Sequence, residues 1–208
     1  MTTRRADVAD LDALVATLAA SHLGYAWERW AVVGKRRAVR LAAAFRSDLE
    51  LLGLPHGVVT KVGHCDAVAV WLPANAPTAI SPDVEAERQR LNAIVYGDRL
   101  EIVEEVDQLI GSASCPDAEW HLATMGTRPS RQRRGLGSEA LRPMLEQLDR
   151  AQLSARLETS STGNVTFYER HGFEVVVELE LPHGAPTTWI MLRRPRTTSE
   201  SVPITVRK

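Results

Sequence analysis

A basic, glycine-rich segment in the second half of the chain carries residue types that bind phosphate. Residues 131–138 read Arg-Gln-Arg-Arg-Gly-Leu-Gly-Ser, and apolar residues follow at helical spacing, at Leu141, Met144, Leu145 and Leu148. The segment is therefore expected at a helix N-terminus, where unpaired backbone N–H groups and the positive end of the helix dipole favour an anion. Gly135 and Gly137 let a phosphate approach the backbone closely, because they have no side chain. Charged contacts to the phosphate oxygens can come from Arg131, Arg133 and Arg134.

This segment differs from two well-known phosphate loops. The Gly-Lys-Ser/Thr ending of a P-loop is missing, and the glycines are too few for a dinucleotide fingerprint. A nucleic acid is the alternative ligand, since four arginines lie within residues 128–134. The formal net charge of −1 and the interleaved glycines favour a small phosphorylated molecule. We therefore expect no nucleic-acid partner.

A strand must deliver this turn, and a second strand and a short helix are expected after the helix that follows it. The apolar run from Trp120 to Met125 predicts the first strand, and Gly126 and Pro129 end it. Ala155 to Thr159 is predicted as the next strand, and Gly163 to His171 as the short helix. These elements would place the glycine-rich turn at one edge of a sheet.

The same stretch resembles a known family. Gln132-x-x-Gly135-x-Gly137 after a strand, followed by residues 164–173 (Asn-Val-Thr-Phe-Tyr-Glu-Arg-His-Gly-Phe), is similar to the GNAT N-acetyltransferases. Within that family the resemblance is greatest to the puromycin N-acetyltransferases, over about residues 58–195. Shared segments include Ala67-Val68-Ala69-Val70-Trp71, Leu122-Ala123-Thr124, Gly135-Leu136-Gly137-Ser138, Leu157-Glu158-Thr159-Ser160, Phe167-Tyr168-Glu169-Arg170 and Trp189. The resemblance implies acetyl-CoA as co-substrate and one α/β (α+β) domain over residues 1–195, with a central mixed, mostly antiparallel sheet flanked by helices.

The resemblance also implies roles for individual residues. Tyr168 occupies the family position that protonates the departing CoA thiolate, and a phenol can donate such a proton directly. The alternative for Tyr168 is a packed core aromatic, although Phe167 and Phe173 are better placed for packing. Many relatives have an asparagine seven positions before this tyrosine, where the chain has Ser161. Cofactor contacts are expected from Met125, Gly126, Thr127, Gln132, Arg133, Arg134, Gly135, Leu136, Gly137, Ser138, Asn164 and Phe167.

A general base is also required, because a lysine-like amine has a pKa of about 10.4 and must lose a proton before it attacks a thioester. Glu119 and His121 share one face at the start of the predicted strand, and Glu158 lies on the next strand. Members of the family differ in this base. His121 is our first candidate and Glu119 an alternative, while Glu158 is either a third candidate or a packed polar residue.

The acceptor side is expected nearer the N-terminus. Residues 22–30 break the helical periodicity as a connection and are rich in aromatic rings. These rings either wall the acceptor site, as Tyr25, Trp27 and Trp30 with Trp71, or cover the core from outside. The acidic residues within 101–107 either attract a cationic amine or form a solvated helix face.

Periodicity predicts the remaining elements. Asp7 is expected to cap a first helix after a short edge strand at residues 4–6. An arginine-rich helix follows over residues 35–52, with Val39 on its inner face. The other predicted elements are a central hairpin over 58–72, a loop over 73–82, two helical segments within 83–110, a loop over 111–117 and strands over 173–181 and 187–193. Residues 196–208 are polar and aperiodic, and are expected to form a flexible tail.

Length and composition set the broad class. With 208 residues, of which 44% are hydrophobic, the chain can bury one core but is short for two domains. No apolar run has the length of a membrane span and the N-terminus lacks the apolar core of a signal peptide, so we expect no membrane contact and a cytoplasmic location. Cys65 and Cys115 are expected to be reduced thiols, and the histidines lack the spacing of metal ligands. The chain is expected to be a monomer or a homodimer, since an exposed final strand would permit pairing between chains.

These observations predict an acetyl-CoA-dependent N-acetyltransferase that acts on the primary amine of a small molecule. The resemblance implies an antibiotic such as puromycin. One alternative is acetylation of a protein lysine or N-terminus. Another is a non-catalytic module of the same fold that binds CoA or sequesters a ligand.

Overall fold

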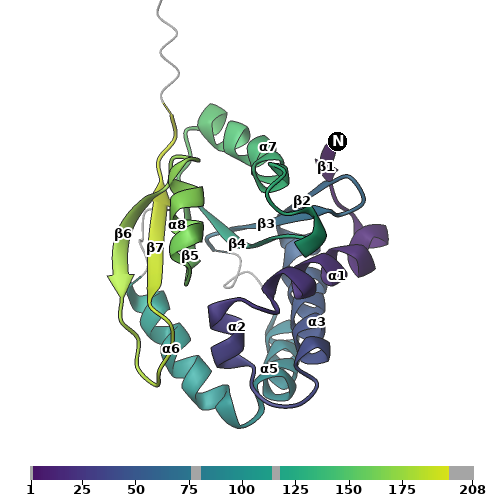
Figure 1. The fold of residues 1–208 in the computed structure, drawn as a ribbon, viewed down its shortest axis with the longest axis vertical. Coiled ribbons are helices and arrows are strands. Elements are labelled where there is room, and N and C mark those ends of the chain that lie inside the picture. Colours follow the sequence, from purple (N-terminus) through teal and green to yellow (C-terminus); the bar gives the residue numbers. More distant parts are fainter. Residues whose placement is uncertain (1, 76–80, 114–117, 197–208) are drawn as a thin grey trace, which may run out of the picture.

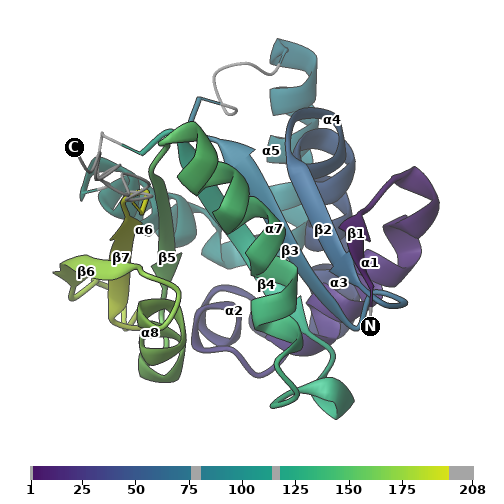
Figure 2. The ribbon, with the colours of Figure 1, turned by 90° about the horizontal axis from the view of Figure 1, so that it is seen from above.

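A mixed sheet of seven strands runs through the described part of the protein, with helices on both of its faces (Figures 1 and 2). The computed structural model describes residues 2–75, 81–113 and 118–196. The strand order is β1-β2-β3-β4-β5-β7-β6, and β4 and β5 are parallel whereas the other neighbouring pairs are antiparallel. The strands are β1 (Thr3–Arg5), β2 (Val58–Val62), β3 (Ala67–Pro73), β4 (Trp120–Thr127), β5 (Ala155–Thr159), β6 (Glu174–Leu179) and β7 (Thr188–Arg193). The mixed, mostly antiparallel single domain predicted from the sequence is confirmed.

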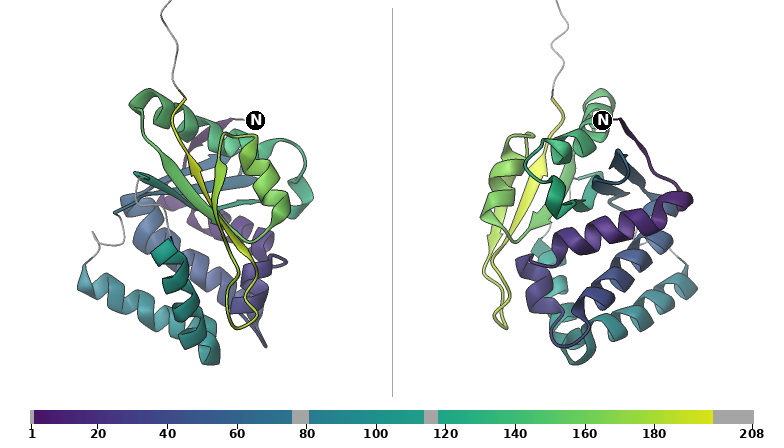
Figure 3. Two further views of the ribbon diagram at one scale, coloured as in Figure 1. Left: turned by 90° about the vertical axis from the view of Figure 1, so that its left-hand side faces the viewer. Right: turned by 45° about the vertical axis from the view of Figure 1, so that its right-hand side comes forward.

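The helices form two layers, one on each face of the sheet. They are α1 (Leu11–His22), α2 (Ala26–Ala31), α3 (Arg37–Asp48), α4 (Leu54–His56), α5 (Pro82–Tyr96), α6 (Leu100–Ala113), α7 (Leu136–Ala151) and α8 (Thr162–Glu169). Helix α7 packs on β2 and β3 from one face, and α1 packs on β3 and β4 from the other. Figure 3 shows that the purple and blue N-terminal helices gather on one side, whereas the yellow-green strands β6 and β7 lie at the opposite end of the molecule.

Strand β3 lies between two apolar cores, one on each face of the sheet. Ala67, Ala69 and Trp71 belong to the core that contains α7, whereas Val68 and Val70 belong to the core that contains α1 and α3. Successive residues of a strand point to opposite faces, so an uninterrupted apolar run is what a strand buried on both faces requires.

Strands β4 and β5 are paired only at their beginnings. The parallel register joins Trp120 to Ala155 and His121 to Arg156, and no further pair follows. On its other side β4 stays paired to β3 as far as Thr127, with a register shift opposite Val70 and Trp71. A bulge of this kind bends a strand and redirects its side chains. The sheet is therefore split between β4 and β5 for most of their length.

Most of the predicted elements are confirmed. Asp7 accepts a hydrogen bond from the backbone N–H of Ala9 at 2.8 Å and caps the short turn that leads into α1. Strands β2 and β3 form the predicted hairpin, and Ser81 caps α5. Residues 97–99 interrupt the long helical stretch between α5 and α6 as expected.

Three expectations are corrected. The connection expected over residues 22–30 contains a helix, α2, because its aromatic residues find partners on other helices. Val39 is 59% exposed, since the inner face of α3 follows Leu41 and Phe45, one helical turn apart. The final strand β7 lies between β5 and β6, so β6 is the edge strand at this end of the sheet.

Some expectations fall partly or wholly on residues 76–80, 114–117 and 197–208. These include almost all of the predicted tail and Cys115, which lie outside the described residues. Cys65 is buried and unpaired. In the described ranges, no helix has the length and apolar character needed to cross a membrane. The same ranges hold no cluster of three or more His, Cys, Asp or Glu side chains suited to a metal ion.

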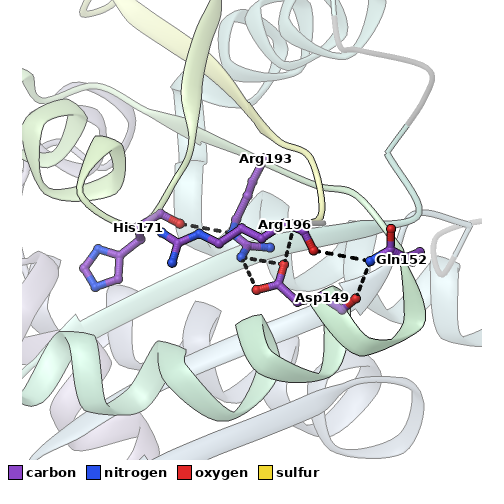
Figure 4. Close-up of polar contacts among 5 residues, drawn as sticks. All are labelled: Asp149, Gln152, His171, Arg193 and Arg196. Atoms are coloured by element: carbon purple, nitrogen blue, oxygen red, sulfur yellow. Dashed lines mark hydrogen bonds and ion pairs between the residues drawn. The ribbon is translucent and has the colours of Figure 1, made fainter. Parts of the chain in front are cut away.

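A buried ion pair joins the last strand to α7 (Figure 4). The guanidinium of Arg193 is 2% exposed and its Nη2 donates to both carboxylate oxygens of Asp149 at 2.7 Å. Its Nε donates to the backbone oxygen of His171 at 3.0 Å, and the backbone N–H of Arg196 donates to Asp149 at 2.8 Å. Burial alone would raise the pKa of Asp149, but the hydrogen bond from Arg193 and that from Arg196 hold it below its usual value. The pair thus fixes the C-terminal strand beside α7.

We expect Asp149→Ala to lower the free energy of unfolding by about 3–5 kcal/mol, because it leaves the buried Arg193 guanidinium without a counter-ion. Urea unfolding measures this loss. The control is Glu87→Ala, which removes the exposed ion pair with Arg90 and should cost about 1 kcal/mol or less. A lowered carboxylate pKa stabilises the fold above the ordinary value of about 3.9, and that stability is lost as the pH falls. The difference between wild type and Asp149→Ala should therefore shrink in acid; equal losses in both variants at neutral pH would contradict this role.

Candidate active site

The glycine-rich segment lines a cavity of about 650 Å³, which we name the loop cavity. Of the residues expected to contact a cofactor, eleven line it: Met125, Gly126, Thr127, Gln132, Arg133, Gly135, Leu136, Gly137, Ser138, Asn164 and Phe167. Arg134 is the exception, since its side chain lies outside the lining. Arg170, which the sequence analysis did not select, also lines the cavity and adds a positive charge to that of Arg133.

The backbone of this segment explains how the cavity is built. Gly135 precedes α7 with φ of 78°, a left-handed conformation that glycine adopts at little cost. A Cβ added to Gly137 would lie 3.3 Å from Met125 and from Phe167, so a side chain there would crowd the cavity wall. The first N–H groups of α7 have no partner within the helix. A phosphate-bearing ligand fits this combination of open helix terminus, glycine backbone and arginine side chains.

A second cavity of about 270 Å³ lies where β4 and β5 separate, and we name it the strand cavity. One wall comes from residues 122–125 of β4, and the facing wall from residues 158–160 at the end of β5. Helices α1, α2 and α6 close it with His22, Glu28 and Asp107 among others. The cavity exists because the two strands stop pairing after His121 and Arg156.

The two cavities meet. Five residues line both of them: His22, Tyr25, Met125, Asn164 and Tyr168. We call this shared wall the junction. A group held in the loop cavity can therefore face a second molecule held in the strand cavity, with Tyr168 beside both. Such a geometry is suited to transfer of a group between two bound molecules.

Tyr168 is the ionisable side chain of the junction with the clearest chemistry. The residue is 6% exposed, and its hydroxyl makes no hydrogen bond to another described residue. Burial, reinforced by nearby Tyr25, raises the pKa of Tyr168, so that the phenol keeps its proton at neutral pH. The hydroxyl is available to donate that proton to a ligand.

Asn164 and Tyr25 are both fixed by Thr159 at the end of β5. The Asn164 amide donates to the Thr159 hydroxyl at 3.2 Å, and the Tyr25 hydroxyl lies 2.8 Å from the same oxygen. The backbone N–H of Ser160 donates to the Tyr25 hydroxyl at 2.5 Å. The expected cofactor contact Asn164 thus lies at the junction, oriented by a neighbouring hydroxyl.

Two of the three candidate bases contact each other, and the third lies elsewhere. His121 Nε2 is 2.6 Å from Glu158 Oε2, and Arg156 also pairs with Glu158. Burial alone would raise the pKa of Glu158, but His121 and Arg156 hold it below its usual value. Glu158 lines the strand cavity, whereas His121 stands behind it. Glu119 is not brought to the site: it precedes β4 and accepts hydrogen bonds from Ser154 at 2.6 and 2.7 Å, outside both cavities.

The expected aromatic wall is only partly formed. Tyr25 and Trp27 line the strand cavity. Trp30 packs outside the cavity lining, where its Nε1 donates to the backbone oxygen of His183 at 3.0 Å and the Arg99 guanidinium lies 4.8 Å from its ring centre. Trp71 is fully buried in the core on the α7 side, because the alternation along β3 places it with Ala67 and Ala69. Neither Trp30 nor Trp71 lines a cavity described here.

Three ionisable residues of the strand cavity were not selected from the sequence: His22, Glu28 and Asp107. Burial lowers the pKa of His22, whose Nδ1 lies 2.9 Å from the backbone oxygen of Leu18. Burial raises the pKa of Glu28 to about 7. No local pattern identifies the first two, because their burial depends on how α1 and α2 pack against elements distant in the sequence. Asp107 belongs to the acidic stretch 101–107, one expected role of which is to attract a cationic amine. Glu105 of the same stretch pairs with His183 at 3.0 Å.

Comparison with known proteins agrees with this geometry. The family model of the acetyltransferase (GNAT) domain matches residues 96–175, which include the glycine-rich segment and Tyr168. In that family acetyl-CoA is the co-substrate.

Solved structures of similar fold cover nearly the whole chain. The histone acetyltransferase HPA2 and related acetyltransferase from Corynebacterium glutamicum has a TM-score of 0.64 at 20% identity, covering 95% of this chain and 98% of that one. The C-terminal condensation domain of Ebony in complex with beta-alanyl-dopamine has a TM-score of 0.65 at 11% identity, covering 93% and 98%. The polyamine N-acetyltransferase of Drosophila melanogaster has a TM-score of 0.52 at 12% identity, covering 93% and 99%. At these identities the likeness establishes a common fold.

Adjacent arginines in the loop provide a matched test of the loop cavity. We expect Arg133→Ala to weaken acetyl-CoA binding several-fold, on the order of tenfold at most, because an exposed cation contributes a screened contact to a phosphate. Arg134→Ala should leave the affinity unchanged, since Arg134 does not line the cavity. Isothermal titration at low and high salt measures both, and the Arg133 effect should shrink in high salt. Equal weakening by the two substitutions would mean that the loop acts only through its overall charge.

Proposed function

We propose that the chain is an acyltransferase of the GNAT type that transfers an acetyl group from acetyl-CoA to the primary amine of a small molecule. The observation that carries this proposal is the junction, where the loop cavity and the strand cavity share Tyr168. Acetyl-CoA would occupy the first and the amine the second. The proposal does not require a metal ion.

The residues of the loop cavity fit acetyl-CoA. Gly135, Gly137 and the start of α7 would hold its pyrophosphate, with charge supplied by Arg133 and Arg170. Met125, Asn164 and Phe167 line the part of the cavity nearer to Tyr168. When bound, acetyl-CoA supplies an activated thioester that an amine can attack. The proton donor and the proton acceptor that the reaction also requires would be side chains of this chain.

Tyr168 is the proposed general acid. Its pKa is raised by burial, so the proton is present at neutral pH, and its hydroxyl is free of other described partners. A proton held at the phenolic oxygen can pass to a departing thiolate at the junction. Among the side chains that line both cavities, His22 is kept neutral by burial and is the less suited to donate.

His121 is the proposed base. It does not line the strand cavity itself, but its partner Glu158 does, at 2.6 Å. A proton from the acceptor amine would therefore reach His121 through water beside Glu158, while the carboxylate stabilises the charged imidazole. Glu119 is unsuited to this role because both Ser154 hydrogen bonds engage it outside the cavities.

A small acceptor is favoured over a protein. The strand cavity is lined by β4, β5 and three helices, and its volume of about 270 Å³ is close to the lower limit for small-molecule sites. The amine of an antibiotic such as puromycin belongs to the chemical class of acceptor proposed here. A panel of puromycin, aminoglycosides, polyamines and lysine-bearing peptides tests the class, with acetyl-CoA consumption read as free thiol. Turnover confined to the peptides would contradict a small-molecule acceptor.

Replacing Tyr168 by Phe separates chemistry from binding. We expect Tyr168→Phe to lower kcat about 100-fold or more, because the proton donor is lost, and to leave acetyl-CoA affinity unchanged. Stopped-flow thiol release and isothermal titration measure the two quantities. An unaltered kcat in Tyr168→Phe would exclude the tyrosine as general acid, and acetyl-CoA binding without turnover on any amine would favour a non-catalytic module.

A further inference from the structure

The strand cavity is acidic. Glu28, Asp107 and Glu158 line it from α2, α6 and β5, and its described lining contains no lysine or arginine. Glu158 is already paired with His121 and Arg156. The other two carboxylates have no ion pair with a described residue. Two acidic groups in a small cavity without a resident cation leave room for a positive charge carried by the ligand.

Glu28 is the more constrained of the two. Its Oε2 is buried and accepts no hydrogen bond from a described residue. The charged and titratable groups that act on it include Tyr25, which directly precedes α2, Arg37 of α3 and Tyr96 of α5, and Asp107 of α6 lines the same cavity. Arg37 does not neutralise the carboxylate by direct contact, since its Nε donates to the backbone oxygen of Glu28 at 3.3 Å. A buried carboxylate oxygen without a partner is costly, and a bound cation would remove that cost.

The position of these acids separates them from the reacting atoms. Glu28 and Asp107 line the strand cavity but not the loop cavity, whereas Tyr168, Asn164 and Met125 line both. The amine that attacks must reach the junction and must be neutral when it does so. A carboxylate away from the junction therefore meets a different part of the same acceptor.

We propose that Glu28 binds a second positive charge of the acceptor, so that the enzyme selects small dicationic amines. The proposal rests on the function proposed above and adds the class of acceptor. One amino group lies at the junction and is acetylated there, while the second remains an ammonium or guanidinium at Glu28, with Asp107 contributing to the field. Trp27, which also lines the cavity, offers an apolar and electron-rich surface for the chain between the two groups.

A pair of acceptors of nearly equal shape tests the charge alone. 1,4-Diaminobutane carries a second ammonium where 4-amino-1-butanol carries a hydroxyl. In wild type, kcat/KM should be about 10-fold to 100-fold higher for the diamine, as expected for one charged hydrogen-bonded contact. In Glu28→Gln this preference should fall to near one, through a higher KM for the diamine, while kcat/KM for the amino alcohol changes little.

Two controls keep the result interpretable. Glu101→Gln removes an exposed carboxylate from α6 and should retain the preference, because Glu101 does not line the cavity. Glu28→Gln should fold, since the burial that raises the pKa of Glu28 penalises its charged form and not a neutral amide. Unchanged acetyl-CoA affinity and circular dichroism check this directly.

The possible outcomes are distinct. An equal loss of kcat for both acceptors in Glu28→Gln would identify the residue as a proton acceptor and overturn the proposal. An unchanged preference would overturn it as well. Calorimetric binding of 1,4-diaminobutane, lost in Glu28→Gln but kept in Glu101→Gln, would support it even if acetyl transfer were absent, and in that case only the proposed function would fail.

Discussion

The separation of β4 from β5 is the constraint on which the rest of the structure depends. Two parallel strands that pair only at Trp120 and His121 expose the β5-facing edge of β4, whose backbone groups must find other partners. The sheet does not collapse across the opening because each strand is held from its other side, β4 by β3 and β5 by β7. The bulge in β4 opposite Val70 and Trp71 falls within the opening. The strand cavity is a consequence of this split, and the loop cavity adjoins it at the junction.

The side chain of Tyr25 connects the N-terminal helices to the end of β5 across the opening. Tyr25, at the start of α2, reaches the end of β5, where it meets the Thr159 hydroxyl and the Ser160 backbone. That contact places α2 against the strand cavity and brings in Trp27 and Glu28 with it. The acetyltransferase domain match covers residues 96–175 and so includes the loop and Tyr168 but not α2. Five residues of the strand-cavity lining thus lie outside the region that the family model describes, namely His22, Tyr25, Trp27, Glu28 and Thr188, and the rest of the lining lies within it.

The sequence predicted those features that depend on local chemistry. A glycine turn before an amphipathic helix is visible in a short window, and so is Tyr168 in its short helix, which is why eleven of the expected cofactor contacts line the loop cavity. Trp71 shows where such prediction ends: β3 is buried on both faces, and only the packing of the helices determines which of the two cores Trp71 belongs to. The prediction of Glu119 as a base fails for a similar reason. Its partner Ser154 lies in a loop that no spacing rule connects to Glu119. Glu28 is ordinary in sequence, and its burial arises from the way α2 is docked.

The electrostatics of the strand cavity change along its length, and this has a consequence for any amine within it. At the junction the ionisable groups are uncharged, because burial keeps the Tyr168 phenol protonated and the His22 imidazole neutral. A poorly solvated site without counter-ions lowers the pKa of an amine and favours its nucleophilic form. Beside Glu28 and Asp107 the opposite holds, since a carboxylate raises the pKa of a nearby amine and keeps it charged. A cavity that favours a neutral amine at one end and a cation at the other would orient an acceptor that carries two amino groups. The protonation states of the two groups would suffice for this, independently of the shape of the acceptor.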